Sequence, residues 1–296
     1  MEIRAGHMRM TGKSFHTTVQ VAVMLLLAAI GSSVTQAAQS PARQQGKPAR
    51  PEEADENDLI DADRPGIADG SSVIGARRVQ VETGVQEEVH RREHLFFVPA
   101  LIRLGISDRL EFRVEGNTFT QTSDTYPTGV TRHVSGLAPF SLGLKYHIAD
   151  SGAGHPSLGV IVRVFPAWGT SDFHTHHVTG DLRLAADWAF APQLKLSLNP
   201  NVGVGIYEDS HGKTFATGLF ALTLNYLPRK RLNPFIDVGI EAPEERNGRV
   251  AVIIDTGVAY IVGHNVQLDA SVGTGAHGQT PPHPFASLGV SFRRRK

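Results

Sequence analysis

Apolar and polar residues alternate along most of this chain, and the alternation is clearest between Arg109 and Asn117. Positions 110, 112, 114 and 116 are apolar or glycine, whereas Glu111, Arg113 and Glu115 are charged. Successive side chains of a strand point to opposite faces, so this segment predicts a two-faced strand. Similar segments recur to the C-terminus, with almost no helical periodicity between them. In a soluble sandwich the apolar face meets a second sheet, and in an outer-membrane barrel it meets lipid.

The N-terminus favours export. Basic residues at positions 4, 9 and 13 precede an apolar run over 19–30, which is followed by small residues up to Ala38. This order predicts a signal peptide over residues 1–38, cleaved after Ala37 or Ala38. The run is shorter than the roughly 20 apolar residues that a spanning helix needs. No later segment is predicted to span a membrane as a helix, so residence in a membrane would require a barrel.

Two further parts follow the signal peptide. Residues 39–58 are polar, proline-rich and free of aromatic residues, and we predict a disordered periplasmic leader there. Residues 59–296 are long enough for one large β domain. The chain has no cysteine, which excludes a disulfide framework. Its formal net charge of +0 gives no electrostatic support for a nucleic-acid partner.

The turn pattern predicts about 12 strands with connections of alternating length. Connections are mostly short at one end, whereas the other end has longer loops over 120–135, 169–178 and 276–284. This pattern is typical of an all-β, transmembrane, antiparallel up-and-down barrel in the bacterial outer membrane. The last strand ends at Phe292, which resembles the terminal signal read by the barrel insertion machinery, although basic residues 293–296 follow it. The predicted strands span residues 76–89, 95–104, 109–119, 139–148, 158–168, 179–190, 194–207, 214–227, 234–241, 249–262, 266–275 and 285–292.

Charged residues within these strands are expected to face the lumen. An Arg or Lys on the lipid face at the bilayer midplane costs about 2–4 kcal/mol, so several outward charges would not be tolerated. Opposite charges on neighbouring strands would then form cross-strand pairs. The predicted lumen-lining residues are Glu82, Arg103, Glu111, Arg113, Glu115, Lys145, Arg163, Asp181, Arg183 and Asp187.

These charges allow two interpretations. One is a charged constriction that selects permeants, and the other is a salt-bridge ladder that fills a closed lumen. The residues concerned are Glu111, Arg113 and Glu115, with Arg103 and Glu82. Eight-stranded barrels are filled and those of 16 to 18 strands leave a channel, so a barrel of about 12 strands is compatible with both.

A second candidate feature lies just before the first strand. Asp63-Arg64-Pro65 would plug or brace the periplasmic mouth, with Arg64 pairing to lumen carboxylates.

An ordered series of short motifs extends this interpretation. The series begins with Asp63-Arg-Pro65 and Gln80-Val-Glu82, the latter followed by Gly84, and ends with Pro166-Ala-Trp-Gly169. Between them stand Pro-Ala-Leu-Ile-Arg-Leu-Gly at 99–105, Ser-Asp-Arg-Leu-Glu at 107–111 and Gly-Leu-Lys-Tyr at 143–146. Over residues 61–169 the chain resembles the outer-membrane family labelled "putative MetA-pathway of phenol degradation", a set of transporter-like barrels. The chain has Gly136-Leu-Ala-Pro139 where that family usually has an acidic residue shortly after a glycine.

The resemblance implies passive passage of small hydrophobic or aromatic molecules. The expected partners are outer-membrane lipid, the insertion machinery and a small-molecule permeant. The oligomeric state stays open. A structural or adhesion barrel with a sealed lumen is the main alternative, and an outer-membrane lipid hydrolase is another.

Neither catalysis nor metal binding is predicted. Ser141 and His147 share a predicted face, but six residues of strand separate them by roughly 20 Å, and no Gly-x-Ser-x-Gly motif occurs. The His174–His177 loop could bind a divalent metal, but histidines on a flexible loop are weak evidence for a site, so we predict none. We predict no catalytic residue and no cofactor.

Overall fold

The computed structural model describes residues 58–90, 93–152, 154–209, 211–278 and 284–294. The predicted signal peptide and all of the predicted leader except Asp58 lie outside these residues. The described part is almost entirely β-sheet, and none of its helices is long and apolar enough to cross a membrane. Two short 3₁₀ helices are present, η2 (Ser171–Phe173) and η3 (Pro192–Leu194). The strands are β1 (Val79–His90), β2 (Glu93–Gly105), β3 (Leu110–Thr125), β4 (Thr131–Gly136), β5 (Ser141–Ala149), β6 (Ser157–Phe165), β7 (Thr179–Ala191), β8 (Leu196–Glu208), β9 (Thr214–Tyr226), β10 (Leu232–Ala242), β11 (Ala251–Gly263), β12 (Val266–His277) and β13 (Phe285–Arg294).

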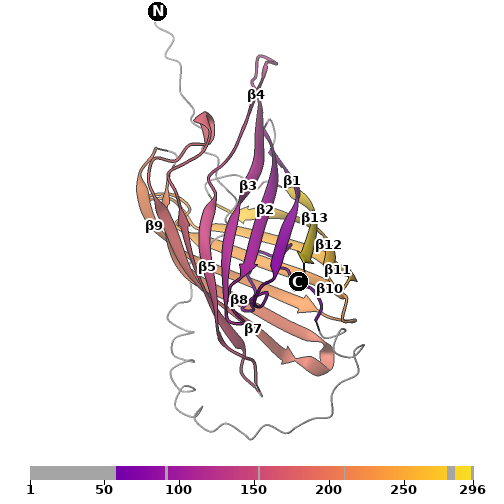
Figure 1. Ribbon diagram of the computed structural model, residues 1–296. Coiled ribbons are helices and arrows are strands. Elements are labelled where there is room, and N and C mark those ends of the chain that lie inside the picture. The colour runs from indigo at the N-terminus through magenta and orange to yellow at the C-terminus, as the bar shows by residue number, and fades with distance from the viewer. Residues whose placement is uncertain (1–57, 91–92, 153, 210, 279–283, 295–296) are drawn as a thin grey trace, which may run out of the picture.

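The strands form a closed antiparallel barrel (Figure 1). Each consecutive pair of barrel strands is hydrogen-bonded, and β1 pairs with β13 to close the ring, with Val79 opposite Arg294. Because β4 pairs only with β3, the ring itself contains 12 strands. The predicted fold class is therefore confirmed. Both Asp58 and the end of β13 lie at the end of the barrel that carries the short turns, where Arg293 Nη2 donates to the Asp58 carbonyl at 2.7 Å.

The strand β4 corrects one prediction, because residues 120–135 were expected to form a loop. Instead β3 continues to Thr125 and pairs with β4, so that Thr125 lies opposite Thr131. This hairpin projects beyond the barrel at its long-loop end (Figure 1). Neither of its faces meets lipid, so its sequence lacks the apolar alternation by which the other strands were found. Its threonines nevertheless suit extended backbone.

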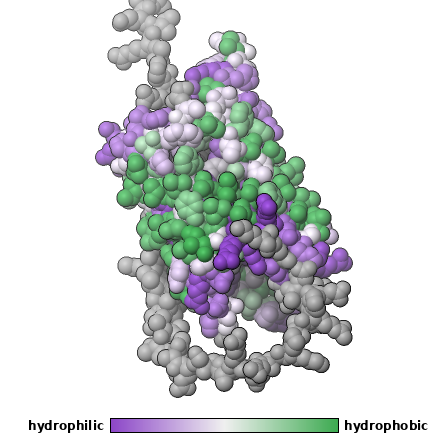
Figure 2. Space-filling view, in the orientation of Figure 1, coloured by the Kyte–Doolittle hydropathy of each residue, from purple (hydrophilic) through white to green (hydrophobic). Residues whose placement is uncertain are grey.

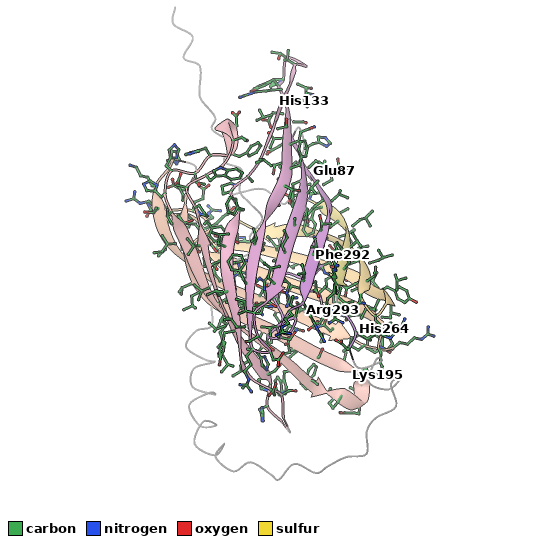
Figure 3. All side chains as sticks on the ribbon, viewed as in Figure 1. Glu87, His133, Lys195, His264, Phe292 and Arg293 are labelled. Carbon is green, nitrogen blue, oxygen red and sulfur yellow. The ribbon has the colours of Figure 1, made fainter. Side chains whose placement is uncertain are left out.

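The outer surface of the barrel carries an apolar belt. Figure 2 shows hydrophobic residues gathered around the middle of the barrel, with hydrophilic residues above and below. On β5 the outward Leu142, Leu144 and Tyr146 are 39%, 46% and 45% exposed, while the intervening Lys145 is fully buried. The hairpin residue His133 and Glu87 lie toward one end of the molecule, and Lys195 and His264 toward the other (Figure 3). Large apolar groups stay exposed in this belt because lipid covers them.

Residues 58–78, here called the lumen segment, run inside the barrel before β1 begins. They form no strand or helix, and their backbone groups bond to inward side chains instead. Ile67 N donates to Asp237 on β10 at 2.8 Å, and Ile74 N donates to Glu111 on β3 at 3.0 Å. The inner side of the barrel is therefore a polar core built around an irregular chain, as buried backbone polar groups require partners.

Candidate functional site: the occupied lumen

Asp63 is the most heavily contacted anion of the lumen segment. Lys145 Nζ on β5 lies 3.1 and 2.9 Å from its two carboxylate oxygens, and Arg113 Nη1 on β3 lies 2.8 Å away. Arg103 Nη1 on β2 approaches to 3.5 Å. The three cationic side chains are at most 2% exposed. Since isolated buried charges are strongly unfavourable, Asp63 and these cations stabilise one another.

Asp69 and Ser71 continue this docking further along the segment. Asp69 accepts from Arg113 Nη2 at 2.9 Å and from Arg183 Nη1 on β7 at 3.3 Å, and its backbone exchanges two hydrogen bonds of 2.9 Å with Asn201 on β8. Ser71 donates from its backbone N to Asp187 at 2.8 Å, and its hydroxyl also bonds to that carboxylate. The segment is thus held to β3, β5, β7 and β8 by buried polar contacts.

Arg64 points to the opposite wall. Its Nη2 donates to Asp269 Oδ1 on β12 at 3.1 Å and to Ser287 Oγ on β13 at 3.0 Å. Its backbone N donates to Glu82 at 2.9 Å, and its carbonyl accepts from Gln267 Nε2 at 2.9 Å. Asp63 and Arg64, adjacent in sequence, therefore contact walls of opposite charge: cations on β2, β3 and β5, and carboxylates on β1 and β12.

The structure places all ten predicted lumen residues on the inner face of the barrel. Eight are buried, while Glu115 and Asp187 are partly exposed to the lumen. Arg103 bridges Glu111 at 2.9 Å and Glu82 at 3.2 Å. Arg163 joins Glu115 at 2.9 Å and Asp181 at 2.6 Å. These groups bind one another and the lumen segment, which is the arrangement of a salt-bridge ladder and differs from an open charged ring.

The sequence interpretation did not single out several residues that hold the segment. Asp237, Asp255 and Asp269 stand between apolar or β-branched neighbours on β10, β11 and β12, so the alternation rule applied to the other charges would have found them. Asp69 and Ser71 gave no such signal, because an irregular segment has no periodicity to read.

Two cavities flank the lumen segment. The upper cavity, toward the long loops, has a volume of about 160 Å³, and its lining includes Phe97, Leu101, Phe285 and Asp255. The lower cavity, toward the short turns, has a volume of about 710 Å³, and its lining includes Leu59 and Ile60 of the segment with Leu227, Arg231 and Ile261 of the wall. Arg64 lines both cavities.

The histidine loop is held by a carboxylate. The backbone N of His176 and of His177 donates to Glu208 at the end of β8, and their Nδ1 atoms lie 2.9 and 3.0 Å from its two oxygens. Within the described ranges, no group of three or more His, Asp or Glu side chains is arranged to hold a metal ion.

Ser141 and His147 each form hydrogen bonds with other residues and not with each other. Ser141 Oγ donates to the Glu115 carbonyl at 3.4 Å, whereas His147 lies 3.1 Å from the Ser71 carbonyl and 2.8 Å from Asp150. The hydrogen bond with His147 lowers the pKa of Asp150 in the exposed β5–β6 turn. His147 therefore links this turn to the lumen segment.

Comparison with known proteins supports the barrel assignment. The model of the family described as "Putative MetA-pathway of phenol degradation" matches residues 62–293. Among solved structures, the COG4313 outer membrane channel from Pseudomonas putida F1 is 11% identical, with 76% of this chain and 98% of that chain covered and a TM-score of 0.59. The NanC porin is 9% identical, with 72% of this chain and 98% of that chain covered and a TM-score of 0.48. The CymD monoaromatic hydrocarbon channel is 8% identical, with 75% of this chain and 89% of that chain covered and a TM-score of 0.43. No curated protein matches the sequence.

Proposed function

The chain belongs to the family described as "Putative MetA-pathway of phenol degradation", and from this premise we propose that it is a channel for passive passage of small hydrophobic or aromatic molecules. It lies in the bacterial outer membrane, where its apolar belt meets lipid. Short turns and the start of β1 mark the periplasmic end, and the β3–β4 hairpin marks the outer end. The observation that supports passage best is the pair of cavities on either side of the lumen segment.

The upper cavity has the chemistry of a site for a small aromatic molecule. Phe97, Leu101 and Phe285 give it an apolar side, and the rest of its lining is largely polar or charged, with Asp255, Ser271 and several arginines. Small-molecule sites generally combine apolar walls with a few polar groups that fix orientation. A phenolic compound presents both kinds of surface. We propose that such compounds enter from outside, occupy this cavity and leave through the lower cavity without an energy source.

A sealed structural barrel is the second candidate function. The buried contacts of Asp63 and Asp69 with the β3–β7 wall favour it, because they close that side of the lumen. Catalysis forms no part of the proposal. His147 bonds to Ser71 and Asp150, and Ser141 bonds to Glu115, so these two residues do not form a nucleophile and base.

Uptake into liposomes separates the two candidates. The refolded protein would be reconstituted and tested with an aromatic glycoside that crosses protein-free lipid slowly, beside protein-free liposomes and measurements of channel conductance. Uptake above the protein-free rate supports the channel. A barrel that is folded, as judged by heat-modifiable migration, and passes neither solute nor ions favours the sealed barrel.

A further inference from the structure

The inner wall of the barrel differs in side-chain size from one side to the other. On β2, β3, β5, β6 and β7 the inward residues include long cationic side chains that reach the lumen segment or its carboxylate partners. On β1, β11 and β13 several inward positions are small. They are Gly84, Gly257, Ala259, Ser287 and Gly289. The segment is therefore packed tightly on one side. On the other it faces several short side chains and is joined to the wall by the Ile67–Asp237 and Arg64–Gln267 hydrogen bonds.

Arg64 fills a gap in the small-residue wall. Gly84 on β1 lies directly opposite Gly289 on β13, and the guanidinium of Arg64 sits against both. A Cβ added at Gly289 would lie 2.5 Å from Arg64 Nε and Nη2, and one at Gly84 would lie 2.8 Å from Nη2. These distances are shorter than van der Waals contact. The paired glycines therefore form a notch that accepts this side chain.

The position of Arg64 between the cavities has a functional consequence. It lines both of them, whereas Arg113, Arg163 and Arg183 line only the upper one. We propose that Arg64 is the gating residue of the channel, and that permeants pass between the lumen segment and the β10–β13 wall when its side chain leaves the glycine notch. This inference rests on the proposed channel function and specifies its path and its barrier.

Incomplete hydrogen bonding along the same wall supports this path. Asp237, Asp255 and Asp269 are 1%, 4% and 6% exposed. One carboxylate oxygen of Asp269 has no hydrogen-bond partner, and Asp237 lies directly opposite Asp255, with which its side chain interacts. Arg64 Nε also has no hydrogen-bond partner. Buried polar atoms normally find partners in protein or water. The carboxylates on β10, β11 and β12 offer partners to water or to the polar group of a permeant along the path.

The contacts of Arg64 restrain its side chain less than the contacts of Asp63 restrain that carboxylate. Arg64 makes one ion pair, with Asp269, and its side chain is 15% exposed. Asp63 faces three cations and is 9% exposed. The lower cavity beside Arg64 has room for its side chain. The side chain can therefore change position while the lumen segment remains docked by Asp63, Asp69 and Ser71.

Single-channel conductance tests the gate. Arg64→Ala and its control would be made in a background that carries Ser71→Cys and Ser157→Cys. The two serine hydroxyl oxygens lie 2.8 Å apart on the packed side, so a disulfide between these cysteines would keep the segment docked. In the oxidised protein, Arg64→Ala should raise conductance several-fold. The matched control Arg109→Ala removes an arginine that is 53% exposed in the β2–β3 turn and lines neither cavity, so it should leave conductance close to that of the background. Heat-modifiable migration would verify that each variant is folded.

Thiol accessibility provides an independent test, because the natural chain has no cysteine. A single Arg64→Cys variant should react with a small charged methanethiosulfonate added from either side, and the modification should reduce current. Ser141→Cys, at a position on β5 that is 1% exposed on the packed side, should react far more slowly.

The outcomes separate failure of the gate from failure of the channel. If the background protein conducts and Arg64→Ala leaves its conductance unchanged, the gate is overturned and the channel stands. Faster modification at position 141 than at position 64 would place the path on the other side of the segment and would also overturn the gate. If neither the background protein nor any variant conducts ions or takes up the aromatic glycoside, both proposals fail.

Discussion

Lys145 on β5 donates to both carboxylate oxygens of Asp63, at 3.1 and 2.9 Å, across 82 positions of sequence. The contact joins the lumen segment to a strand near the middle of the packed wall. Both charges have little access to solvent, because Lys145 is fully buried and Asp63 is 9% exposed. The segment therefore depends on the assembled barrel for its position, and the barrel depends on the segment to neutralise its interior cations.

Asp63→Asn should destabilise the docked segment strongly. Removing one member of a buried ion pair typically costs about 3–5 kcal/mol, because the remaining charge is left buried without a partner. Here three cations would lose their shared carboxylate. Urea unfolding in detergent should show lower stability, and limited proteolysis should cut the region of residues 58–78 faster than in the natural protein.

Asp172→Asn is the matched control for this prediction. Asp172 pairs with Arg132 at 3.4 Å, but the two side chains are 48% and 55% exposed. Exposed pairs are worth about 0–1 kcal/mol, so this change should have little effect. Equal losses of stability for Asp63→Asn and Asp172→Asn would show that the buried network does not stabilise the segment.

Leu144→Arg should weaken folding into lipid by about 2–4 kcal/mol, the value for a basic residue near the bilayer midplane. Leu144 lies on the outer face near the middle of β5. Val130→Arg, in the hairpin that projects beyond the barrel, is the control and should change little. The measurement is the folded fraction in lipid vesicles against urea concentration. If Leu144→Arg and Val130→Arg had the same small effect on the folded fraction, the assignment of the apolar belt to the lipid-facing surface would be contradicted.

Shortening the β3–β4 hairpin should leave the barrel intact. Between Leu110 and Glu115 β3 pairs with β5, whereas β4 pairs only with the extension from Thr120 to Thr125. Replacing residues 124–132 by an Asn-Gly turn should therefore preserve heat-modifiable migration. Loss of the folded form would mean that the hairpin is needed to close the barrel.

Glu208→Ala should loosen the His174–His177 loop without unfolding the barrel. The carboxylate accepts the backbone N–H groups of His176 and His177, and its removal leaves these donors to water. We expect faster proteolysis near the loop and a change in unfolding free energy below about 1 kcal/mol, because the partner side chains His176 and His177 are 53% and 51% exposed, although Glu208 itself is 6% exposed. Glu87→Ala, at an exposed pair with His94 of 3.7 Å, is the control and should not change cleavage of the loop.

The sequence pattern predicted the barrel well because lipid and lumen impose opposite chemistry on alternate residues. This rule located all 12 strands of the ring and the inward direction of Arg113, Lys145 and Arg163. It missed β4, which lies beyond the membrane and is free of that constraint. It also placed the start of β1 at residue 76, where the structure begins it at Val79, because Ala76 and Arg78 belong to the end of the lumen segment.

The site was less predictable for a different reason. Asp63 and Arg64 were recognised as candidates for the periplasmic mouth. The packing of residues 66–74 through the lumen, however, depends on wall partners 31 to 170 positions away, such as Arg103 for Ser72 and Asp237 for Ile67. Local patterns do not encode such pairings. The glycine notch was equally hidden, since Gly84 and Gly289 meet only when the barrel closes.

The most direct test of the account is the conductance of the Ser71→Cys/Ser157→Cys protein in planar bilayers, before and after reduction. We predict discrete channel events in the oxidised protein and the same conductance after reduction, because permeants pass along the β10–β13 wall while the segment remains docked. Current that appears only after reduction would show that the whole segment must leave the lumen. The absence of current in both states, together with the absence of both current and glycoside uptake in the natural protein, would contradict the channel itself.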